Sequence, residues 1–277
     1  MTAMTKNRSL FFFPITAICL ILSISLSVAE TEKFLDFPAS SLIDVDEGTF
    51  ECWLKFAFEP LAMHKGYSGR GALFSIDYHD PAFPRDGMDF AIGTKFSGER
   101  TATGMMCLVR IGAIIEGGEL KHPGLVGLGQ TLKRNQWIHF AAVWKGCDDV
   151  QIYVNSEHRG GRTFHGSFCR PLNSGARLYF GNSPERPRAS LLAIDEVRIS
   201  SIARKPEAFS MHGGKPQLDP WTLMVLDFDT VEAAGDGIIP TYAADMSIEP
   251  QPIPAVYRLV EGKYGKGLAF TATEFAE

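Results

Sequence analysis

The sequence lacks the short motifs that identify common classes of metal protein and hydrolase. No two cysteines have the Cys-x-x-Cys spacing, so a zinc ribbon or a thioredoxin-type redox site has no support. The Gly-x-Ser-x-Gly elbow of serine hydrolases and the His-Glu-x-x-His helix of zinc proteases are missing as well. Few segments repeat apolar residues at the i, i+3, i+4, i+7 spacing, which argues against a fold built from long amphipathic helices.

The sequence also lacks an excess of positive charge. It has 27 Lys and Arg residues against 32 Asp and Glu residues, a formal net charge of −5. Nucleic-acid binders need basic surfaces that neutralise phosphates, so we expect no nucleic-acid partner. A hydrophobic share of 45% excludes wholesale disorder. The 27 glycines and 16 prolines follow no triplet repeat and indicate many short elements joined by turns.

Residues 1–29 have the organisation of a secretory signal peptide. Lys6 and Arg8 precede an uncharged apolar stretch that ends in the small-x-small sequence Ser27-Val28-Ala29. This pattern predicts cleavage before Glu30, a secreted or extracytoplasmic protein, and no stable membrane span after cleavage. The alternative is an uncleaved anchor that tethers the protein to the membrane, because the stretch is just long enough to cross a bilayer.

Export changes the interpretation of the cysteines, because disulfides form in oxidising compartments. Cys52, Cys107, Cys147 and Cys169 remain after cleavage, and they allow three pairings. We expect the pair Cys147–Cys169, since both lie in predicted loops, which adapt to disulfide geometry more easily than strand interiors. Cys52 and Cys107 lie in apolar strand patterns, where a free cysteine acts as a small core residue.

The rest of the sequence is dominated by short alternating or apolar segments rich in aromatic and β-branched residues. They predict strands at Lys33–Phe37, Thr49–Phe58, Ala72–Asp77, Met88–Ile92, Met105–Ile111, Leu125–Leu132, Gln136–Trp144, Val150–Asn155, Arg177–Gly181 and Leu191–Ser200. About ten strands at this spacing predict an all-β fold, a two-sheet antiparallel sandwich over residues 30–214. One short helix is predicted at Pro206–Met211, with proline in its first turn.

Residues 215–277 form a linker and tail with a different composition. A strand is predicted at Leu223–Phe228, and residues 230–256 are rich in Gly, Pro, Ala and Asp. The tail is either the start of a second similar domain or an extension that covers an edge of the first sandwich.

Several segments in the expected order carry a family resemblance, and they are Gly48–Lys55, Trp137–Trp144, Val150–Asn155, Leu178–Asn182, Ile194–Ile199 and Arg204–Phe209. Together they resemble a laminin-G-like domain of the concanavalin A-like lectin/glucanase group. The resemblance covers about residues 33–212 and implies a jelly-roll sandwich. It implies little about the ligand, because lectins, adhesion modules and enzymes share this fold.

Enzymes of the glucanase branch place two catalytic carboxylates on one strand in a Glu-x-Asp-x-Glu or Glu-x-Asp-x-x-Glu spacing. Neither spacing occurs here, so we expect no enzymatic activity. Asp195 and Glu196 are adjacent, and a regular strand points them to opposite faces. His139 and the other histidines are interpreted as hydrogen-bonded or solvated side chains.

Asp195 is the candidate metal ligand. Regular alternation puts Asp195 on the same face as Val197 and Ile199, so its carboxylate begins in the core and needs compensation. Backbone N–H groups or a neighbouring arginine are one form of compensation. The other is calcium, because some laminin-G-like domains hold a structural Ca²⁺ with aspartate and carbonyl oxygens.

Three predicted loops combine aromatic and polar side chains in the manner of a carbohydrate site. Their candidate ligand-binding residues are Tyr67, Arg70, Tyr78, His79, Arg85 and Phe96. The sequence therefore favours a secreted, non-catalytic module that binds an extracellular glycan or protein. The alternatives are an adhesion or structural module that contacts another protein, and a glycan-active hydrolase or lyase of the same superfamily.

Overall fold

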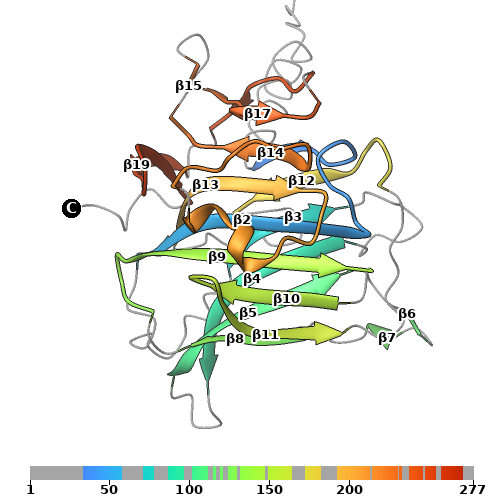
Figure 1. The fold of residues 1–277 in the computed structure, drawn as a ribbon, viewed down its shortest axis with the longest axis vertical. Helices are drawn as coiled ribbons and strands as arrows, with labels where there is room; N and C mark the ends of the chain where they lie inside the picture. Colours follow the sequence, from blue (N-terminus) through green and yellow to red (C-terminus); the bar gives the residue numbers. More distant parts are fainter. Residues whose placement is uncertain are drawn as a thin grey trace, which may run out of the picture. The chain divides into compact units, whose positions relative to one another are not determined.

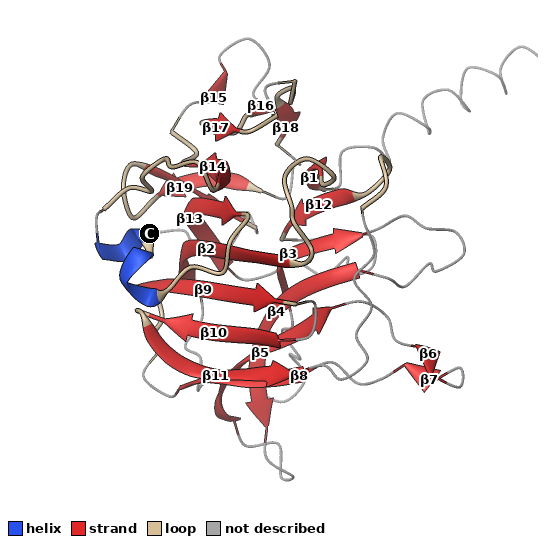
Figure 2. Ribbon diagram, turned by 45° about the vertical axis from the view of Figure 1, so that its right-hand side comes forward, coloured by secondary structure: helices blue, strands red, loops and turns tan. Residues whose placement is uncertain are grey.

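The strand patterns form two antiparallel sheets in a computed structural model of the chain (Figure 1, Figure 2). The structure describes residues 34–57, 71–77, 87–96, 102–111, 115–116, 119–120, 124–129, 132–146, 149–163, 172–181, 192–212, 214–229, 231–232, 237–245, 247–253 and 257–270. Over these ranges one sheet has six strands in the order β1-β12-β3-β4-β5-β8. Their bounds are β1 (Leu35–Pro38), β3 (Gly71–Asp77), β4 (Gly87–Phe96), β5 (Ala102–Ile111), β8 (Gly124–Gly129) and β12 (Arg177–Phe180).

The second sheet has nine strands over the same ranges, in the order β11-β10-β9-β2-β13-β14-β17, with β20 paired to both β13 and β19. Their bounds are β2 (Glu47–Phe56), β9 (Trp137–Lys145), β10 (Asp149–Val154), β11 (Glu157–Thr163), β13 (Leu192–Ser200), β14 (Thr222–Leu226), β17 (Tyr242–Ala243), β19 (Arg258–Glu261) and β20 (Lys266–Ala269). Five very short strands form two small separate sheets, and they are β6 (Ile115–Glu116), β7 (Glu119–Leu120), β15 (Val231–Glu232), β16 (Gly237–Ile238) and β18 (Gln251–Pro252). The predicted all-β sandwich is therefore confirmed.

The main hydrophobic core lies between the two large sheets. Phe50 of the nine-stranded sheet contacts Phe74 and Phe180 of the six-stranded sheet, with ring centroids 4.6 Å and 6.4 Å apart. All three side chains are fully buried. Large aromatic side chains contribute strongly to such a core because each removes a large apolar area from water.

The predicted hairpin is present as β9 and β10, which pair with Trp144 opposite Val150 and Ala141 opposite Tyr153. Cys52, on the neighbouring strand β2, is free and buried, as the sequence predicts. Burial raises the pKa of its thiol well above the usual value, which keeps the sulfur protonated and unreactive. Strand β11 follows β10 directly and was not predicted, because Glu157–Thr163 contains two glycines and little apolar alternation.

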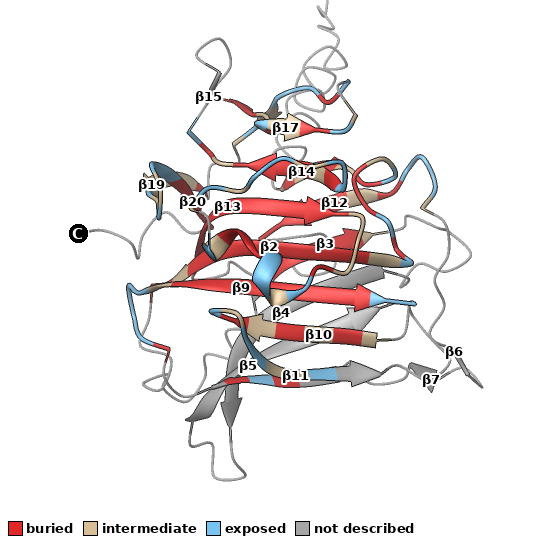
Figure 3. Ribbon diagram, viewed as in Figure 1, coloured by how far each residue is buried: buried red, intermediate tan, exposed pale blue. Residues whose placement is uncertain are grey.

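The outer face of β2, β9 and β13 is covered, so these strands are buried on both sides (Figure 3). Part of the cover is the segment that was predicted as a helix at Pro206–Met211. It consists instead of two 3-10 turns, η1 (Pro206–Ala208) and η2 (Ser210–His212). Phe209 between them is extended, with ψ of 147°, and its ring packs on His139 and Tyr153. The helix breaks there because burying Phe209 outweighs continuing a short helix.

Four strands of residues 215–277, β14, β17, β19 and β20, join the nine-stranded sheet, while β15, β16 and β18 form a small sheet of their own. Strand β14 pairs with the second half of β13, and β20 pairs with its first half through Ala193–Ala269 and Ile194–Leu268. These pairs occupy the hydrogen-bonding edge that β13 would otherwise leave open. The described helical segments include none long and apolar enough to cross a membrane.

Candidate functional site

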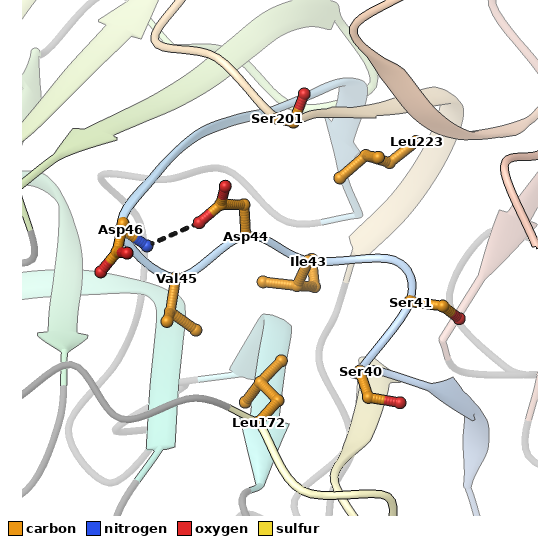
Figure 4. Close-up of a pocket in the computed structure, with 9 residues that line it drawn as sticks. All are labelled: Ser40, Ser41, Ile43, Asp44, Val45, Asp46, Leu172, Ser201 and Leu223. Carbon is orange, nitrogen blue, oxygen red and sulfur yellow. Dashed lines mark hydrogen bonds between the residues drawn. The ribbon is translucent and has the colours of Figure 1, made fainter.

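A pocket of about 560 Å³ opens beside the loop between β1 and β2 (Figure 4). Nine of the described residues line it, of which six come from this loop and three come from segments far away in the sequence. The lining residues are Ser40, Ser41, Ile43, Asp44, Val45, Asp46, Leu172, Ser201 and Leu223. Its volume is in the range typical of small-molecule sites, and its wall mixes hydroxyl, carboxylate and aliphatic side chains.

Hydrogen bonds to the ends of neighbouring strands hold the pocket loop in place. The Trp144 indole N–H donates to the carbonyl of Asp44 at 2.9 Å, and the Gly146 N–H donates to the carbonyl of Asp46 at 2.7 Å. Within the loop, the Asp46 N–H donates to Asp44 Oδ1 at 2.9 Å, which is an Asx turn. Because Trp144 is fully buried, the loop is anchored to the main hydrophobic core.

The polar groups of the pocket are suited to a ligand that carries hydroxyl groups. Asp44 and Asp46 are exposed and bring two carboxylates, and Ser40, Ser41 and Ser201 bring hydroxyls. The hydroxyls of Ser41 and Ser201 already donate within the protein, so they can accept from a ligand. None of the described lining residues is basic. The hydroxyl of Ser41 donates to Asp245 Oδ2 at 2.8 Å, which adds a third carboxylate nearby. The carboxylates of Asp44, Asp46 and Asp245 therefore bring negative charge to this side of the pocket and favour neutral or cationic groups beside them.

Of the six predicted ligand-binding residues, the structure describes only the backbone of Phe96. Phe96 is the last residue of β4, where its backbone pairs with Ala102 of β5. The other five fall outside the described residues, and they are Tyr67, Arg70, Tyr78, His79 and Arg85. The predicted disulfide partners Cys147 and Cys169 also fall outside, so their pairing stays a prediction.

Asp195 is buried as predicted, but the predicted face was wrong. The β2–β13 register shifts between Asp195 and Arg198, and Glu196 has a φ of 48°. This β-bulge reverses the alternation, so Ile194 and Val197 both contact the main core. Asp195, paired with Trp53, therefore lies on the outer face of the sheet.

The C-terminal hairpin compensates the Asp195 carboxylate. Asp195 Oδ2 accepts the backbone N–H groups of Lys263 and Tyr264 at 2.7 Å and 2.9 Å. Asp195 Oδ1 accepts the N–H of Glu196 at 2.8 Å. Three N–H donors form an anion-binding environment, which does not suit calcium because calcium takes oxygen ligands. No group of three or more potential ligand side chains in the described ranges has a geometry that could hold a metal ion. Calcium binding stays a prediction without support from this geometry.

A second polar cluster lies under the 3-10 turns and includes His139, Glu51 and Ser210. Glu51 Oε2 lies 3.1 Å from His139 Nε2 and accepts the hydroxyl of Ser210 at 3.0 Å, and Glu51 Oε1 accepts the Arg198 guanidinium at 2.6 Å. Burial alone would raise the pKa of Glu51, but the hydrogen bond from His139 and the charge of Arg198 lower it. All four residues are buried, so the cluster fastens the turns to the sheet and His139 is a hydrogen-bonded side chain, as predicted.

Comparison with known proteins agrees with the fold. Residues 117–208 match the family model of the concanavalin A-like lectin/glucanases superfamily, laminin G type, which confirms the predicted resemblance over that part of the chain. No curated protein matches the sequence.

Three solved structures illustrate the structural likeness. A heptameric SAP-like pentraxin from Limulus polyphemus is 13% identical, with 82% of this chain and 93% of that chain covered and a TM-score of 0.49. A candidate carbohydrate-binding protein from Bacteroides ovatus is 17% identical, with 76% and 56% covered and a TM-score of 0.43. The receptor-binding domain of botulinum neurotoxin D is 11% identical, with 60% and 36% covered and a TM-score of 0.38.

Proposed function

We propose that this chain, with its concanavalin A-like lectin fold, is a secreted, non-catalytic module that binds a neutral glycan in the pocket of the β1–β2 loop. The observation that carries the proposal is the composition of the pocket wall, in which three serine hydroxyls and two carboxylates stand among aliphatic side chains. Secretion is supported by the basic and then apolar residues 1–29.

Sugars present hydroxyl groups that donate and accept hydrogen bonds, together with C–H groups that need apolar contact. The carboxylates of Asp44 and Asp46 can accept from sugar hydroxyls, and charged acceptors make stronger hydrogen bonds than neutral ones. Ile43 and Leu223 supply apolar surface in the same wall. We expect sulfated and uronic-acid glycans to bind more weakly, because the carboxylates of Asp44 and Asp46 would repel their anionic groups.

Binding of the purified chain to an array of neutral, amino-sugar, sulfated and uronic-acid glycans tests the proposal. We expect binding to neutral glycans, weaker or no binding to the anionic classes, and no release of reducing ends from any bound glycan. Absence of binding to every class would overturn the proposal, and release of reducing ends would identify an enzyme instead.

The variant Asp44→Asn tests whether this pocket is the site. Asn can still accept the Asp46 N–H, so the loop keeps its turn while the charged acceptor is lost. Since hydrogen bonds to charged groups contribute about 1.5–3 kcal/mol, we expect glycan affinity to fall by about tenfold or more. The matched control is Glu249→Gln, which removes an exposed carboxylate outside the pocket lining and should leave affinity unchanged. Equal affinity of Asp44→Asn and the wild type would place the site elsewhere.

A further inference from the structure

Two large hydrophobic side chains of the described residues are exposed, and both lie on the short turn that leads into β14. Leu218 is 56% exposed and Trp221 is 53% exposed. An exposed tryptophan is unusual because its ring has the largest apolar area of any side chain, and covering it gains the most free energy. A tryptophan in this position therefore indicates a contact surface more strongly than a single exposed leucine does.

The turn is held in one conformation before any ligand arrives. The two terminal guanidinium nitrogens of buried Arg204, Nη1 and Nη2, donate to the Asp219 carboxylate at 2.8 Å each. Asp219 Oδ1 also accepts the Trp221 N–H at 3.0 Å and the Thr222 hydroxyl at 2.9 Å. The hydrogen bond from Arg204 lowers the pKa of Asp219 to about 2, so this arrangement holds at all physiological pH values. A fixed backbone lowers the entropy that is lost when the Trp221 ring binds a ligand.

Trp221 belongs to the chain segment that builds one wall of the pocket. Its carbonyl accepts the N–H of Ser201 at 2.9 Å, and Ser201 lines the pocket. Leu223, two residues further along, also lines the pocket, and its carbonyl is held by the N–H of Ala244 at 2.8 Å. Figure 4 shows Ser201 and Leu223 as neighbours in this wall. The backbone of Trp221 is therefore hydrogen-bonded to the wall residue Ser201, and Trp221 precedes the wall residue Leu223 by two positions.

We propose that Trp221 is the aromatic platform of the glycan site, and that its indole ring stacks on the apolar C–H face of a neutral pyranose whose hydroxyls reach the carboxylates of the pocket. This inference rests on the proposed function and adds a specificity residue to it. A stacked ring requires a sugar with a flat face of C–H groups. The preferred ligands are then β-linked neutral hexoses, which present such a face along an extended chain.

The test is isothermal titration of the full chain with short β-linked oligosaccharides of glucose, mannose and galactose. We compare the wild type with Trp221→Ala, Trp221→Phe and Leu218→Ala. Truncation of an aromatic anchor costs more than about 1 kcal/mol, so Trp221→Ala should lose more than about fivefold in affinity. Trp221→Phe should recover part of the loss, and Leu218→Ala, which truncates an equally exposed apolar side chain of the same turn, should bind as the wild type does.

Fluorescence separates stacking from a structural role of Trp221. Trp53 and Trp144 are buried and Trp137 is half-buried, so comparison with Trp221→Phe identifies the part of the emission change that comes from Trp221. We expect a shift to shorter wavelength in the wild type and none in Trp221→Phe, while the melting temperatures of the two proteins agree.

The outcomes distinguish the two proposals. Wild-type binding that Trp221→Ala leaves unchanged would overturn the platform and keep the glycan-binding function. Absence of binding to all three oligosaccharide series and to the array would overturn both. Self-association of the wild type that Trp221→Ala abolishes, without glycan binding, would show that the turn is a protein-contact surface and would also overturn the platform.

Discussion

At the scale of single residues, Glu51 is a buried carboxylate that accepts hydrogen bonds from three neighbouring residues. It accepts from Arg198, His139 and both the N–H and hydroxyl of Ser210. Arg198 in turn donates to the carbonyls of Ala208 and Gln217. One carboxylate on β2 thus fixes the 3-10 turns and the start of the linker.

Replacement of Glu51 tests this dependence. We expect Glu51→Ala to lower the free energy of unfolding by about 3–5 kcal/mol, because it leaves the Arg198 charge buried without its partner. The control Glu157→Gln breaks the ion pair between Glu157 and Arg159, in which the Glu157 side chain is 70% exposed. This variant should lower the free energy of unfolding by less than about 1 kcal/mol. Urea unfolding followed by circular dichroism measures both, and equal effects would refute a structural role for the cluster.

Gly181 is a second residue whose environment permits no side chain. Its φ is 76°, and a Cβ atom there would lie 2.9 Å from the Phe270 ring and 3.0 Å from the Tyr257 hydroxyl. Gly214 has a similar φ of 89°, but a Cβ atom there would meet no heavy atom of the described residues within 4 Å.

This pair separates backbone strain from steric overlap. Gly214→Ala should cost about 1–2 kcal/mol from the left-handed conformation alone. Gly181→Ala should cost about 1–3 kcal/mol more, because the methyl group displaces two core rings. Chemical denaturation of the two variants measures the difference, and equal losses would show that Phe270 and Tyr257 can move aside.

At the scale of elements, the strands were predictable and their interruptions were not. An unbroken run rich in apolar and aromatic residues, such as Gln136–Trp144, gives β9 within one residue at each end, because such a run is typical of a strand buried on both faces. Within a regular strand the side chains alternate between the two faces with a period of two. The bulge at Asp195–Glu196 breaks that period without a glycine or proline to mark it. Sequence reasoning therefore found that Asp195 is buried and misjudged its face.

The same bulge brings two carboxylates close together in a buried position. Burial raises the pKa of Glu196 to about 8 and that of Asp195 to about 7. Apart from Lys215 Nζ at 3.3 Å, neither Glu196 oxygen has a polar partner among the described residues, whereas Asp195 has three N–H donors. We therefore expect Glu196 to be the protonated member of the pair.

The raised pKa values predict that stability falls as pH rises. The unfolded carboxyls titrate near pH 4, so between about pH 4 and pH 8 the folded state binds more protons than the unfolded state. The free energy of unfolding should decrease across this window, and Glu196→Gln, which stays neutral, should flatten the decrease. Urea unfolding at a series of pH values checks this against Glu207→Gln, an exposed control. A wild-type stability that increases over the window would contradict the assignment.

The pocket shows a similar limit of sequence reasoning. The loop sequence Ser40-Ser41-Leu42-Ile43-Asp44-Val45-Asp46 has the hydroxyl and carboxylate groups of a polar site, and this signal was available. Leu172, Ser201 and Leu223 are far from this loop in the sequence and line the pocket only because of the way the strands are arranged in the two sheets. Such long-range neighbours follow from sheet order, which local patterns do not encode.

At the scale of the whole molecule, the tail is part of the sandwich. It supplies β14 and β20 to β13, Asp219 to buried Arg204, and two N–H donors to buried Asp195. Without it, β13 has an open edge and two buried charges lose their partners.

A chain that ends at residue 214 should therefore fail to fold. Residues 215–277 contribute Met224, Leu226, Leu268 and Phe270 to the main core. Loss of a large core side chain costs about 2–5 kcal/mol, and a typical domain has only about 5–15 kcal/mol in total. We expect circular dichroism and urea titration to show no cooperative transition in the shortened chain and one transition in the full chain. The variant Asp219→Asn in the full chain isolates the ion pair and should remain folded. A cooperative transition of the shortened chain at the wild-type midpoint would make residues 215–277 an independent unit.

The pairing of β20 with β13 also sets the order of events during biosynthesis. Ala193 and Ile194 emerge from the ribosome more than seventy residues before Leu268 and Ala269, their partners. Until those late residues arrive, half of a central strand can be recruited by any other extended polypeptide. A chaperone that shields nascent β-strands would therefore benefit this protein most between the synthesis of β13 and the synthesis of β20.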